Sequence, residues 1–197
     1  MDVPDLTDLL PSLGLAIALA SCAGLRAWLP LLMAGTLARA GVLELGSHFQ
    51  FLSSNRALLL FALATAIEVA GDKVPAVDHA LDVLGTVLRP AAGSLLAASV
   101  MWRVSDPLTA TALGVAVGAP SALVPHAAKS ALRAASTAFT AGFANPVLSL
   151  LEDVATVALF ALAVVVPMLV AAAVLALSFL VLRRLLRPRP RPAVPAA

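Results

Sequence analysis

Ten ionisable side chains lie within or beside the apolar stretches of this sequence, where a charge is costly. They are Glu68, Asp72, Lys73, Asp78, Asp82, Arg89, Lys129, Arg133, Glu152 and Asp153. In a membrane interior a single charge costs about 2.5–3.5 kcal/mol on insertion scales. Ten unpaired charges would therefore cost more than the roughly 5–15 kcal/mol that stabilises a typical fold. We expect these side chains to pair with one another, to line water or to lie at the membrane surface.

The acidic residues of this group form two pairs, each with a spacing of four residues. Glu68 and Asp72 share one helix face, and Asp78 and Asp82 share another. A glycine and a proline between the pairs predict a break in the helix. A broken helix inside a membrane protein is tolerated where it faces protein or a cavity. Four carboxylates around such a break suit a hard cation or a proton relay.

The alternative to a cation or proton site is neutralisation by basic side chains. Lys73 and Arg89 could neutralise the acidic residues from the same half of the chain. Lys129 and Arg133 could do so from the other half. In either case the charges would fix the register of the helices rather than bind a ligand.

The segment 126–142 carries a polar stripe on an otherwise apolar helix. At steps of three or four residues the stripe contains His126, Lys129, Arg133, Ser136, Thr137 and Thr140. Such a stripe cannot face lipid. One interpretation is a buried helix in which Lys129 and Arg133 pair with acidic residues. The other is a polar pathway whose basic pair attracts carboxylate or phosphate groups.

Two parts of the chain resemble each other, which predicts an internal repeat. The repeat would divide the chain into halves 9–104 and 108–182, with the working site between them. Arg26 would be the counterpart of Arg133 and would face it across a pseudo-two-fold axis. The matching strings are Leu25-Arg26-Ala27 with Leu132-Arg133-Ala134, and Ala34-Gly35 with Ala141-Gly142.

Motifs of known enzyme chemistry are absent. The sequence has no Gly-x-Ser-x-Gly, His-Glu-x-x-His, Walker or Gly-x-Gly-x-x-Gly string. Cys22 is the single cysteine, so no disulfide framework forms. His48 and His79 have no partner at metal-ligand spacing. We therefore expect no enzyme activity, no cofactor and no metal site.

The elements that must position these residues are helices in a membrane. Apolar residues make up 61% of the 197 residues and charged residues 12%, which leaves too few charges for a water-facing shell. The mean hydropathy is +0.99. We predict an all-α, polytopic integral membrane bundle of five to seven segments, with broken or re-entrant helices, in one domain over residues 1–182.

Prolines, glycines and polar stretches divide the apolar sequence into segments. Glu44 to Arg56 is the expected external loop, and Pro167 is expected to kink the last run. The predicted apolar segments are 9–24, 27–40, 57–70, 76–102, 108–124, 126–142 and 154–182.

The C-terminal residues 183–197 form an Arg/Pro-rich tail, which we expect to be disordered. Because the tail directly follows an apolar run, the positive-inside rule predicts that it lies in the cytoplasm. A topology anchor beside anionic headgroups explains these arginines better than nucleic-acid binding does. The acidic N-terminus does not match a cleaved signal peptide.

Four strings resemble a family of bacterial membrane proteins catalogued as domain of unknown function 4126. The resemblance covers roughly residues 10–160 and is most specific in the block Glu68–Asp78. It implies a compact multi-helix domain in the bacterial inner membrane and no known activity. The strings are Gly24-Leu-Arg-Ala-Trp-Leu-Pro-Leu-Leu32, Glu68-Val-Ala-Gly-Asp-Lys-Val-Pro-Ala-Val-Asp78, Arg89-Pro-Ala-Ala-Gly93 and Asn145-Pro-Val-Leu-Ser-Leu-Leu-Glu-Asp153.

Three functions remain open for this chain. The leading hypothesis is a small transporter or channel for an ion or small solute, in which the acidic pairs bind a cation or proton and Lys129, Arg133 and Arg26 bind an anionic group. The alternative is a non-transporting assembly or scaffold protein whose ion pairs are structural. The third is recognition of lipid headgroups by the basic stripe. The lipid bilayer is the expected partner, with a second copy of the chain as a further one.

Overall fold

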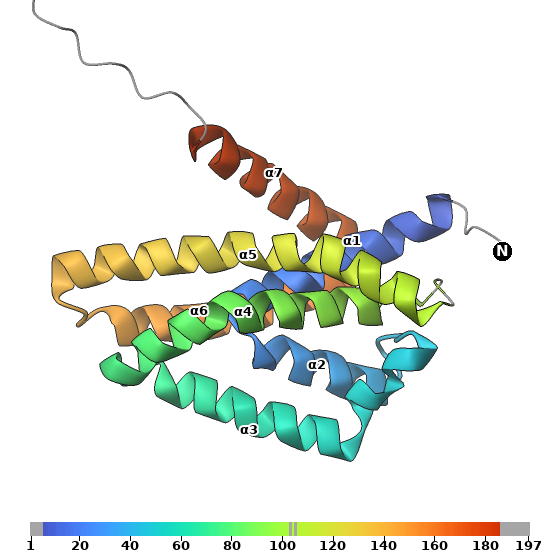
Figure 1. The fold of residues 1–197 in the computed structure, drawn as a ribbon, viewed down its shortest axis with the longest axis horizontal. Coiled ribbons are helices and arrows are strands. Elements are labelled where there is room, and N and C mark those ends of the chain that lie inside the picture. Colours follow the sequence, from blue (N-terminus) through green and yellow to red (C-terminus); the bar gives the residue numbers. More distant parts are fainter. Residues whose placement is uncertain (1–5, 103, 105, 186–197) are drawn as a thin grey trace, which may run out of the picture.

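The computed structural model describes residues 6–102, 104 and 106–185, although the side chains of residues 6–9, 75, 76, 78, 79, 181 and 185 lie outside the description. All regular structure in this part of the chain is helical (Figure 1). The elements are α1 (Leu6–Leu25), α2 (Trp28–Arg39), η1 (Ser47–Ser53), α3 (Asn55–Gly71), α4 (Pro75–Ser99), α5 (Pro107–Thr140), α6 (Asn145–Val165) and α7 (Pro167–Leu185).

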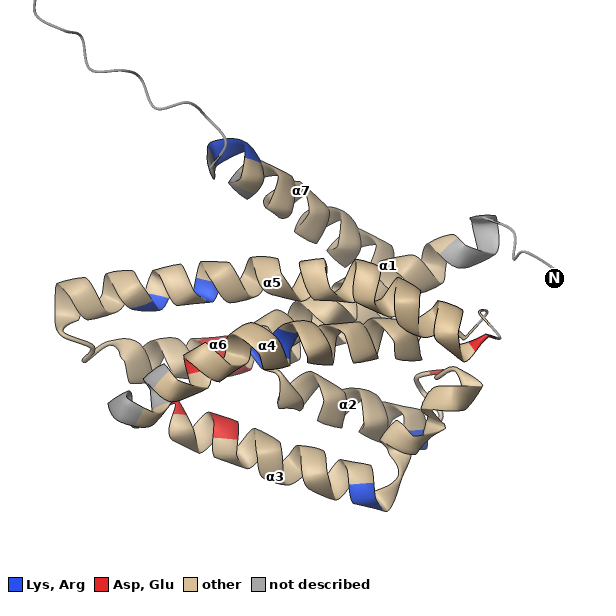
Figure 2. Cartoon of the chain, viewed as in Figure 1, with Lys and Arg blue, Asp and Glu red and all other residues tan. Residues whose placement is uncertain are grey.

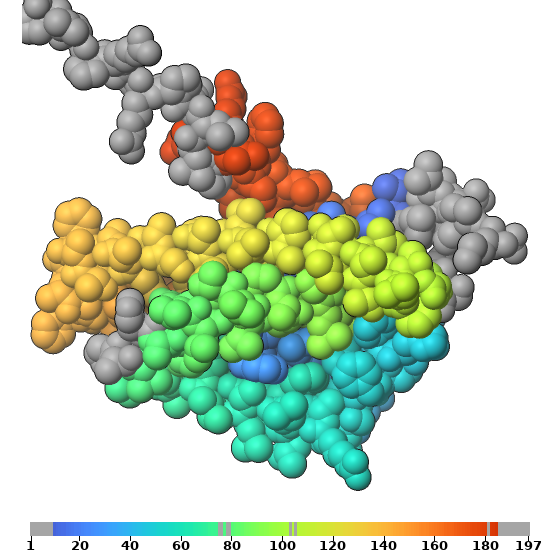
Figure 3. Space-filling model, viewed as in Figure 1, coloured from blue at the N-terminus to red at the C-terminus, as the bar shows by residue number. Residues whose placement is uncertain are grey.

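Helix α1 is the centre of the bundle and packs against α4, α5, α6 and α7. Its residues Ala16, Ala18, Leu19 and Cys22 are fully buried. Helices α2 and α3 pack against each other on one side, with η1 between them in sequence. Helix α7 diverges from α5 toward its C-terminal end (Figures 1 and 3).

Small residues bring α1, α4 and α5 into close contact. A Cβ added at Gly118 of α5 would lie 2.3 Å from the carbonyl oxygen of Gly93 in α4. A Cβ added at Gly24 would lie 2.2 Å from the carbonyl oxygen of Ala122. Glycine at these positions therefore lets the helix backbones touch, as is common between membrane helices.

Several apolar helices indicate an integral membrane protein. The candidate spans among the described residues are Ala80–Ser99, Pro107–Thr140, Asn145–Val165 and Pro167–Arg184. A fifth span results if η1 and α3, which meet at an angle of 58°, are taken together. The helices thus support four or five spans. The sequence predicted five to seven, so the two ranges agree only at five spans.

The structure corrects two of the segments predicted from proline positions. Helix α5 runs without a break through Pro120 and Pro125, so 108–124 and 126–142 are one helix. The run 154–182 is not one kinked helix, because α6 ends at Val165 and α7 begins at Pro167. The bounds of α1, α2, α3 and α4 agree within three residues with the predicted segments.

Buried neighbours and a hydroxyl hydrogen bond lie beside a proline that α5 tolerates. Next to Pro120, the side chains of Ser121 and Ala122 are buried among neighbouring helices, and the Ser121 hydroxyl donates to the carbonyl of Val117. Neighbouring helices and hydroxyl groups of this kind make proline tolerable in membrane helices. At the α6–α7 junction Val165 is 76% exposed, although Ala163 and Val170 on either side of it are buried.

The turn between α4 and α5 ends at Asp106, whose carboxylate caps α5. The hydroxyl and the backbone N–H of Thr109 both donate to this carboxylate. These two hydrogen bonds hold the pKa of Asp106 below its ordinary value, and the bond from the Thr109 hydroxyl has the larger effect. The cap satisfies an N–H group that the first turn of a helix otherwise leaves without a partner.

Replacing Gly118 by alanine should destabilise the protein by about 1–3 kcal/mol, because the added methyl group meets backbone atoms of Gly93 that cannot rotate away. The measurement is thermal unfolding in detergent. Gly46→Ala is the matched control, since its Cβ would have no neighbour closer than 3.4 Å and the Gly46 φ is −55°. Equal melting temperatures for the two variants would contradict the close packing of α4 on α5.

Candidate functional site

Asp72 is the centre of a buried charge cluster. Figure 2 shows that the coloured charged positions of α5 and α6 lie in the half of the bundle where these two helices are joined. Its oxygen Oδ2 pairs with Arg26, lies 3.0 Å from Arg133 Nη2 and lies 3.5 Å from Lys129 Nζ. Its other oxygen, Oδ1, is buried and has no hydrogen-bond partner among the described residues. Asp72 follows the last residue of α3, so it caps that helix while it binds cations from two other elements.

Helix α6 supplies two further carboxylates to the cluster. Glu152 accepts hydrogen bonds from Arg133 Nε at 3.0 Å and Nη2 at 2.9 Å, and its Oε2 lies 2.9 Å from Lys129 Nζ. Asp153 Oδ1 lies 2.7 Å from Arg26 Nε. The guanidinium of Arg133 therefore joins Asp72 to Glu152 through a planar set of donors that a lysine could not provide.

Arg26 is fully buried at the break between α1 and α2, where backbone groups at the two helix ends bind side chains instead of other backbone groups. The carbonyl of Leu25 accepts from Lys129 Nζ at 3.4 Å. The N–H groups of Ala27 and Trp28 donate to the carboxylate of Glu68 at 3.1 and 3.3 Å. Each helix end thus meets the sign of charge that its dipole favours, a cation at the C-terminus of α1 and an anion at the N-terminus of α2.

A smaller group of polar residues joins α4 to α5 beside the cluster. Arg89 is buried, lies 3.5 Å from Asp82 and donates to Nδ1 of His126. Because a guanidinium remains protonated, Nδ1 must be the acceptor and the His126 proton must be on Nε2. Nε2 lies 3.5 Å from the hydroxyl of Thr86. Asp82 also lies 4.0 Å from Arg133, which links this group to Asp72.

Six of the predicted site residues form the cluster around Asp72, and Asp82 reaches its edge through Arg133. The six are Arg26, Asp72, Lys129, Arg133, Glu152 and Asp153. Glu68 caps α2 and Asp82 pairs mainly with Arg89. Lys73 is exposed and takes part in none of the ion pairs of the described residues, and the side chain of Asp78 lies outside them.

The described carboxylates of the segment 68–82 therefore have different partners instead of converging on one point. No group of three or more His, Cys, Asp or Glu side chains among the described residues is arranged to hold a metal ion. A role of the cluster in moving an ion or solute stays a prediction.

Sequence reasoning missed Ser149, which is fully buried and accepts from Arg26 Nη2 through both its hydroxyl, at 2.9 Å, and its carbonyl, at 3.1 Å. Its position was available as a signal, because Ser149, Glu152, Asp153 and Thr156 recur at helical spacing on one face of α6. The far end of the basic stripe differs from the rest. Thr137 and Thr140 are exposed and bind the turn that follows α5.

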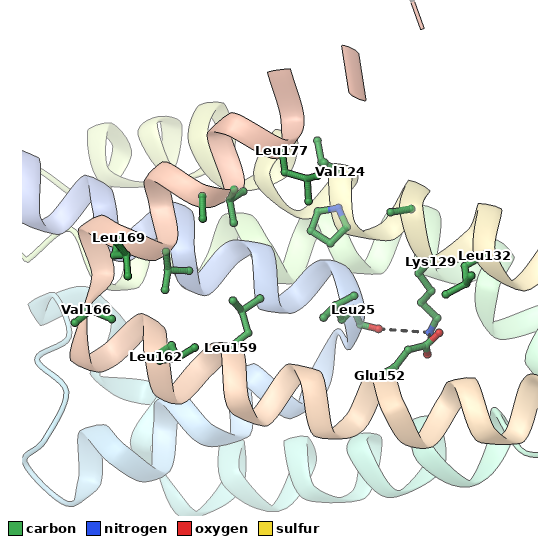
Figure 4. A pocket seen from close by; sticks show the side chains of 15 residues that line it. Leu25, Val124, Lys129, Leu132, Glu152, Leu159, Leu162, Val166, Leu169 and Leu177 are labelled. Atoms are coloured by element: carbon green, nitrogen blue, oxygen red, sulfur yellow. Dashed lines mark hydrogen bonds and ion pairs between the residues drawn. The ribbon is translucent and has the colours of Figure 1, made fainter. Parts of the chain in front are cut away.

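A cavity of about 590 Å³ borders the cluster between α5, α6 and α7 (Figure 4). Lys129 and Glu152 are the charged residues among those that line it, and the others are leucine, valine, alanine and proline. The ion pairs around Asp72 are thus adjacent to an apolar space.

Removing one partner of the Arg133–Glu152 pair should destabilise the protein by about 3–5 kcal/mol, because the remaining charge stays buried without its partner. We expect Arg133→Gln and Glu152→Gln each to show this loss in detergent unfolding. The double variant should lose at least about 1 kcal/mol less than the sum of the two single variants, which is the sign of direct coupling.

Lys73→Gln is the control for this cycle, because the Lys73 side chain is exposed. It should change the stability by no more than about 0.5 kcal/mol. Additive losses in the double variant would contradict the ion pair.

A family model described as Domain of unknown function (DUF4126) matches residues 13–187. No curated protein matches the chain, and no solved structure does. The match extends past residue 160, where the motifs end, and includes all of α6 and α7. The chain belongs to the DUF4126 family.

Proposed function

We propose that this chain is a membrane transporter that moves a small anionic solute together with a proton, with the cluster around Asp72 as its working site. One observation carries the proposal. Two helix breaks, one at Arg26 and one that begins at Asp72, and three buried cations meet at a single buried carboxylate. Broken helices that bring charged ends to one polar site are typical of secondary transporters.

The charge balance of the cluster supports coupling to a proton. The three cations Arg26, Lys129 and Arg133 face the three carboxylates Asp72, Glu152 and Asp153, so the six groups are neutral together. A proton on Asp72 would leave the cluster with one excess positive charge. An uncompensated buried charge is costly, and an anion bound beside the cations would remove that cost.

Exchange of partners within the cluster is energetically feasible. The Coulomb attraction of a buried ion pair roughly balances its desolvation, so replacing one anionic partner by another changes the free energy little. Lys129 lies 2.9 Å from Glu152 and 3.5 Å from Asp72, at the edge of the cavity. A solute that enters the cavity would therefore meet Lys129 and Glu152 together.

The second candidate function is a non-transporting scaffold protein. It is favoured by the direct contact of the charges, since the six groups already neutralise one another. In that case the ion pairs fix the register of α3, α5 and α6 and carry nothing across the membrane.

The surroundings of the protein are part of the proposal. We place the chain in the inner membrane of a bacterium, with its Arg-rich C-terminal end in the cytoplasm. We further propose that it acts without a cofactor, is not an enzyme, and has two related halves that exchange access to the site.

Asp72→Asn should reduce proton-coupled anion uptake at least tenfold. The asparagine amide cannot take up the proton that gives the cluster its excess positive charge, so the anion is no longer bound. The assay uses proteoliposomes that contain a pH-sensitive dye and face inward gradients of chloride, phosphate or dodecyl phosphate. The wild type should show internal acidification that depends on one of these anions. Size-exclusion profiles establish that the variant is folded.

Glu44→Gln is the matched control, since Glu44 is an exposed carboxylate outside the cluster, and it should retain the wild-type rate. Full uptake by Asp72→Asn, or no anion-dependent acidification by the wild type, would exclude the proposed transport. If the chain is a scaffold, no variant should show uptake. The double variant Arg133→Glu with Glu152→Arg should then recover the stability that each of these single variants loses.

A further inference from the structure

Arg89 is a buried cation of α4 with two acceptors within reach. Its Nη1 donates to Nδ1 of His126, whereas its Nη2 lies 3.5 Å from Oδ1 of Asp82. That carboxylate oxygen has no hydrogen-bond partner among the described residues, and neither has Nε of Arg89. The guanidinium is therefore hydrogen-bonded to the imidazole, while an unused acceptor lies next to it.

Gly85 lets the guanidinium of Arg89 lie against its own helix. A Cβ added at Gly85 would lie 3.0 Å from Cζ and 3.2 Å from Nε and Nη1 of Arg89. Long side chains in a helix point back toward its N-terminus, so the guanidinium lies over the turn that leads to Asp82. A short movement along α4 would thus exchange His126 for Asp82 as its acceptor.

His126 accepts a hydrogen bond from Arg89 only while its ring is neutral. The bond requires a lone pair on Nδ1. A proton that binds this lone pair turns Nδ1 into an N–H donor and places a second positive charge beside the guanidinium. Arg89 must then move, and Asp82 is the acceptor next to it. Histidine is the side chain whose charge ordinarily changes between about pH 5 and pH 8.

A polar face of α4 leads from the start of a membrane span toward His126. Asp82, Thr86 and Arg89 follow one another at steps of four and three residues, so they share one face of the helix. Asp82 lies near the start of the candidate span Ala80–Ser99, and its side chain is 21% exposed. Thr86 lies one turn deeper, with its hydroxyl 3.5 Å from Nε2 of His126. A proton therefore has a polar approach to the imidazole from this end of α4.

The charged groups that face His126 belong to α4 and α5. They are Arg89, Asp82 and Lys129. The titratable groups of the neighbouring segments bind elsewhere. Cys22 of α1 donates to a carbonyl of its own helix, and Arg26 and Glu152 bind within the cluster around Asp72. Asp82 is thus the carboxylate that acts on both His126 and Arg89.

We propose that His126 is a proton-binding site outside the cluster around Asp72. A proton from water binds the lone pair of Nδ1, the hydrogen bond from Arg89 breaks, and Arg89 donates to Asp82 instead. The ring then has an N–H at both nitrogens and one positive charge. Uptake of this proton does not require transport.

The consequence for the cluster rests on the proposed transport function. Asp82 also lies 4.0 Å from Arg133, which binds Asp72 and Glu152. A carboxylate that is hydrogen-bonded to Arg89 attracts Arg133 less. The proton on His126 would therefore regulate the working site through Asp82, and uptake would depend on the pH.

The test is a pH titration of the full chain in dodecyl maltoside with isotope-labelled histidine, followed through the ring nitrogen signals by NMR. The signal that is missing in His126→Gln identifies His126, and the exposed His48 is the internal reference. At about pH 8, Nδ1 should be unprotonated and Nε2 protonated, and at about pH 5 both should be protonated. A proton on Nδ1 already at about pH 8, or none at about pH 5, would overturn the proposal.

Two variants of α4 should move the titration midpoint of His126 in opposite directions. Arg89→Gln removes the neighbouring cation and should raise the midpoint by at least about half a pH unit. Asp82→Asn removes both the negative charge and the acceptor that receives Arg89, and it should lower the midpoint by as much. Glu44→Gln is the matched control, because Glu44 is an exposed carboxylate outside this group, and it should leave the midpoint unchanged.

Equal midpoints in the wild type and both α4 variants would overturn the exchange of Arg89 between its two acceptors. The wild-type spectra decide the proton site even if a variant does not fold. A merely structural hydrogen bond between Arg89 and His126 would be lost in Arg89→Gln without any titration of the wild-type ring, and that result would also overturn the proposal.

The outcomes separate this inference from the proposed function. Titration of His126 in a chain that moves no anion would support the proton site and exclude the transporter. Anion-dependent acidification by a chain whose His126 never takes up a proton would exclude the proton site and support the transporter. If both are found, the uptake rate of the wild type should change with pH across the midpoint, and that of His126→Gln should not. The same pH dependence in both would overturn the regulatory link.

Discussion

Electroneutrality around Asp72 is the constraint on which the rest of this structure depends. A single buried carboxylate holds three cations, and two carboxylates of α6 complete the balance. The cations come from the α1–α2 break and from α5, so the cluster ties four parts of the chain together. The break between α1 and α2, which would be costly in lipid, is stabilised because its backbone N–H and carbonyl groups bind Glu68 and Lys129.

The sequence predicted the kinds of residue at the site better than it predicted their partners. Spacing of three and four residues correctly identified Lys129 and Arg133 as one face of a helix, and the cost of charge in a membrane implied that they would be paired. Pairing itself depends on which helices become neighbours. Lys73 is next to Asp72 in the chain yet is exposed, while Arg26, 46 residues away, is the partner of Asp72.

The helix boundaries show the same limit. Single prolines were expected to divide the chain at Pro125 and to bend it at Pro167, but the first leaves α5 continuous and the second separates two helices. Local backbone preference is similar at both positions, so a proline by itself does not decide whether a helix continues. The cavity beside α7 could not be inferred from the sequence, because it exists only through that separation.

The distribution of the cluster along the chain has a consequence for biosynthesis. Arg26 enters the membrane early, but Asp72 follows 46 residues later and the α6 residue Ser149 123 residues later. At the usual pace of translation, about 5–20 residues per second, this charge waits for several seconds before its partners exist. Because an unpaired charge is costly in lipid, we expect the segment around Arg26 to stay near water until α6 has been made.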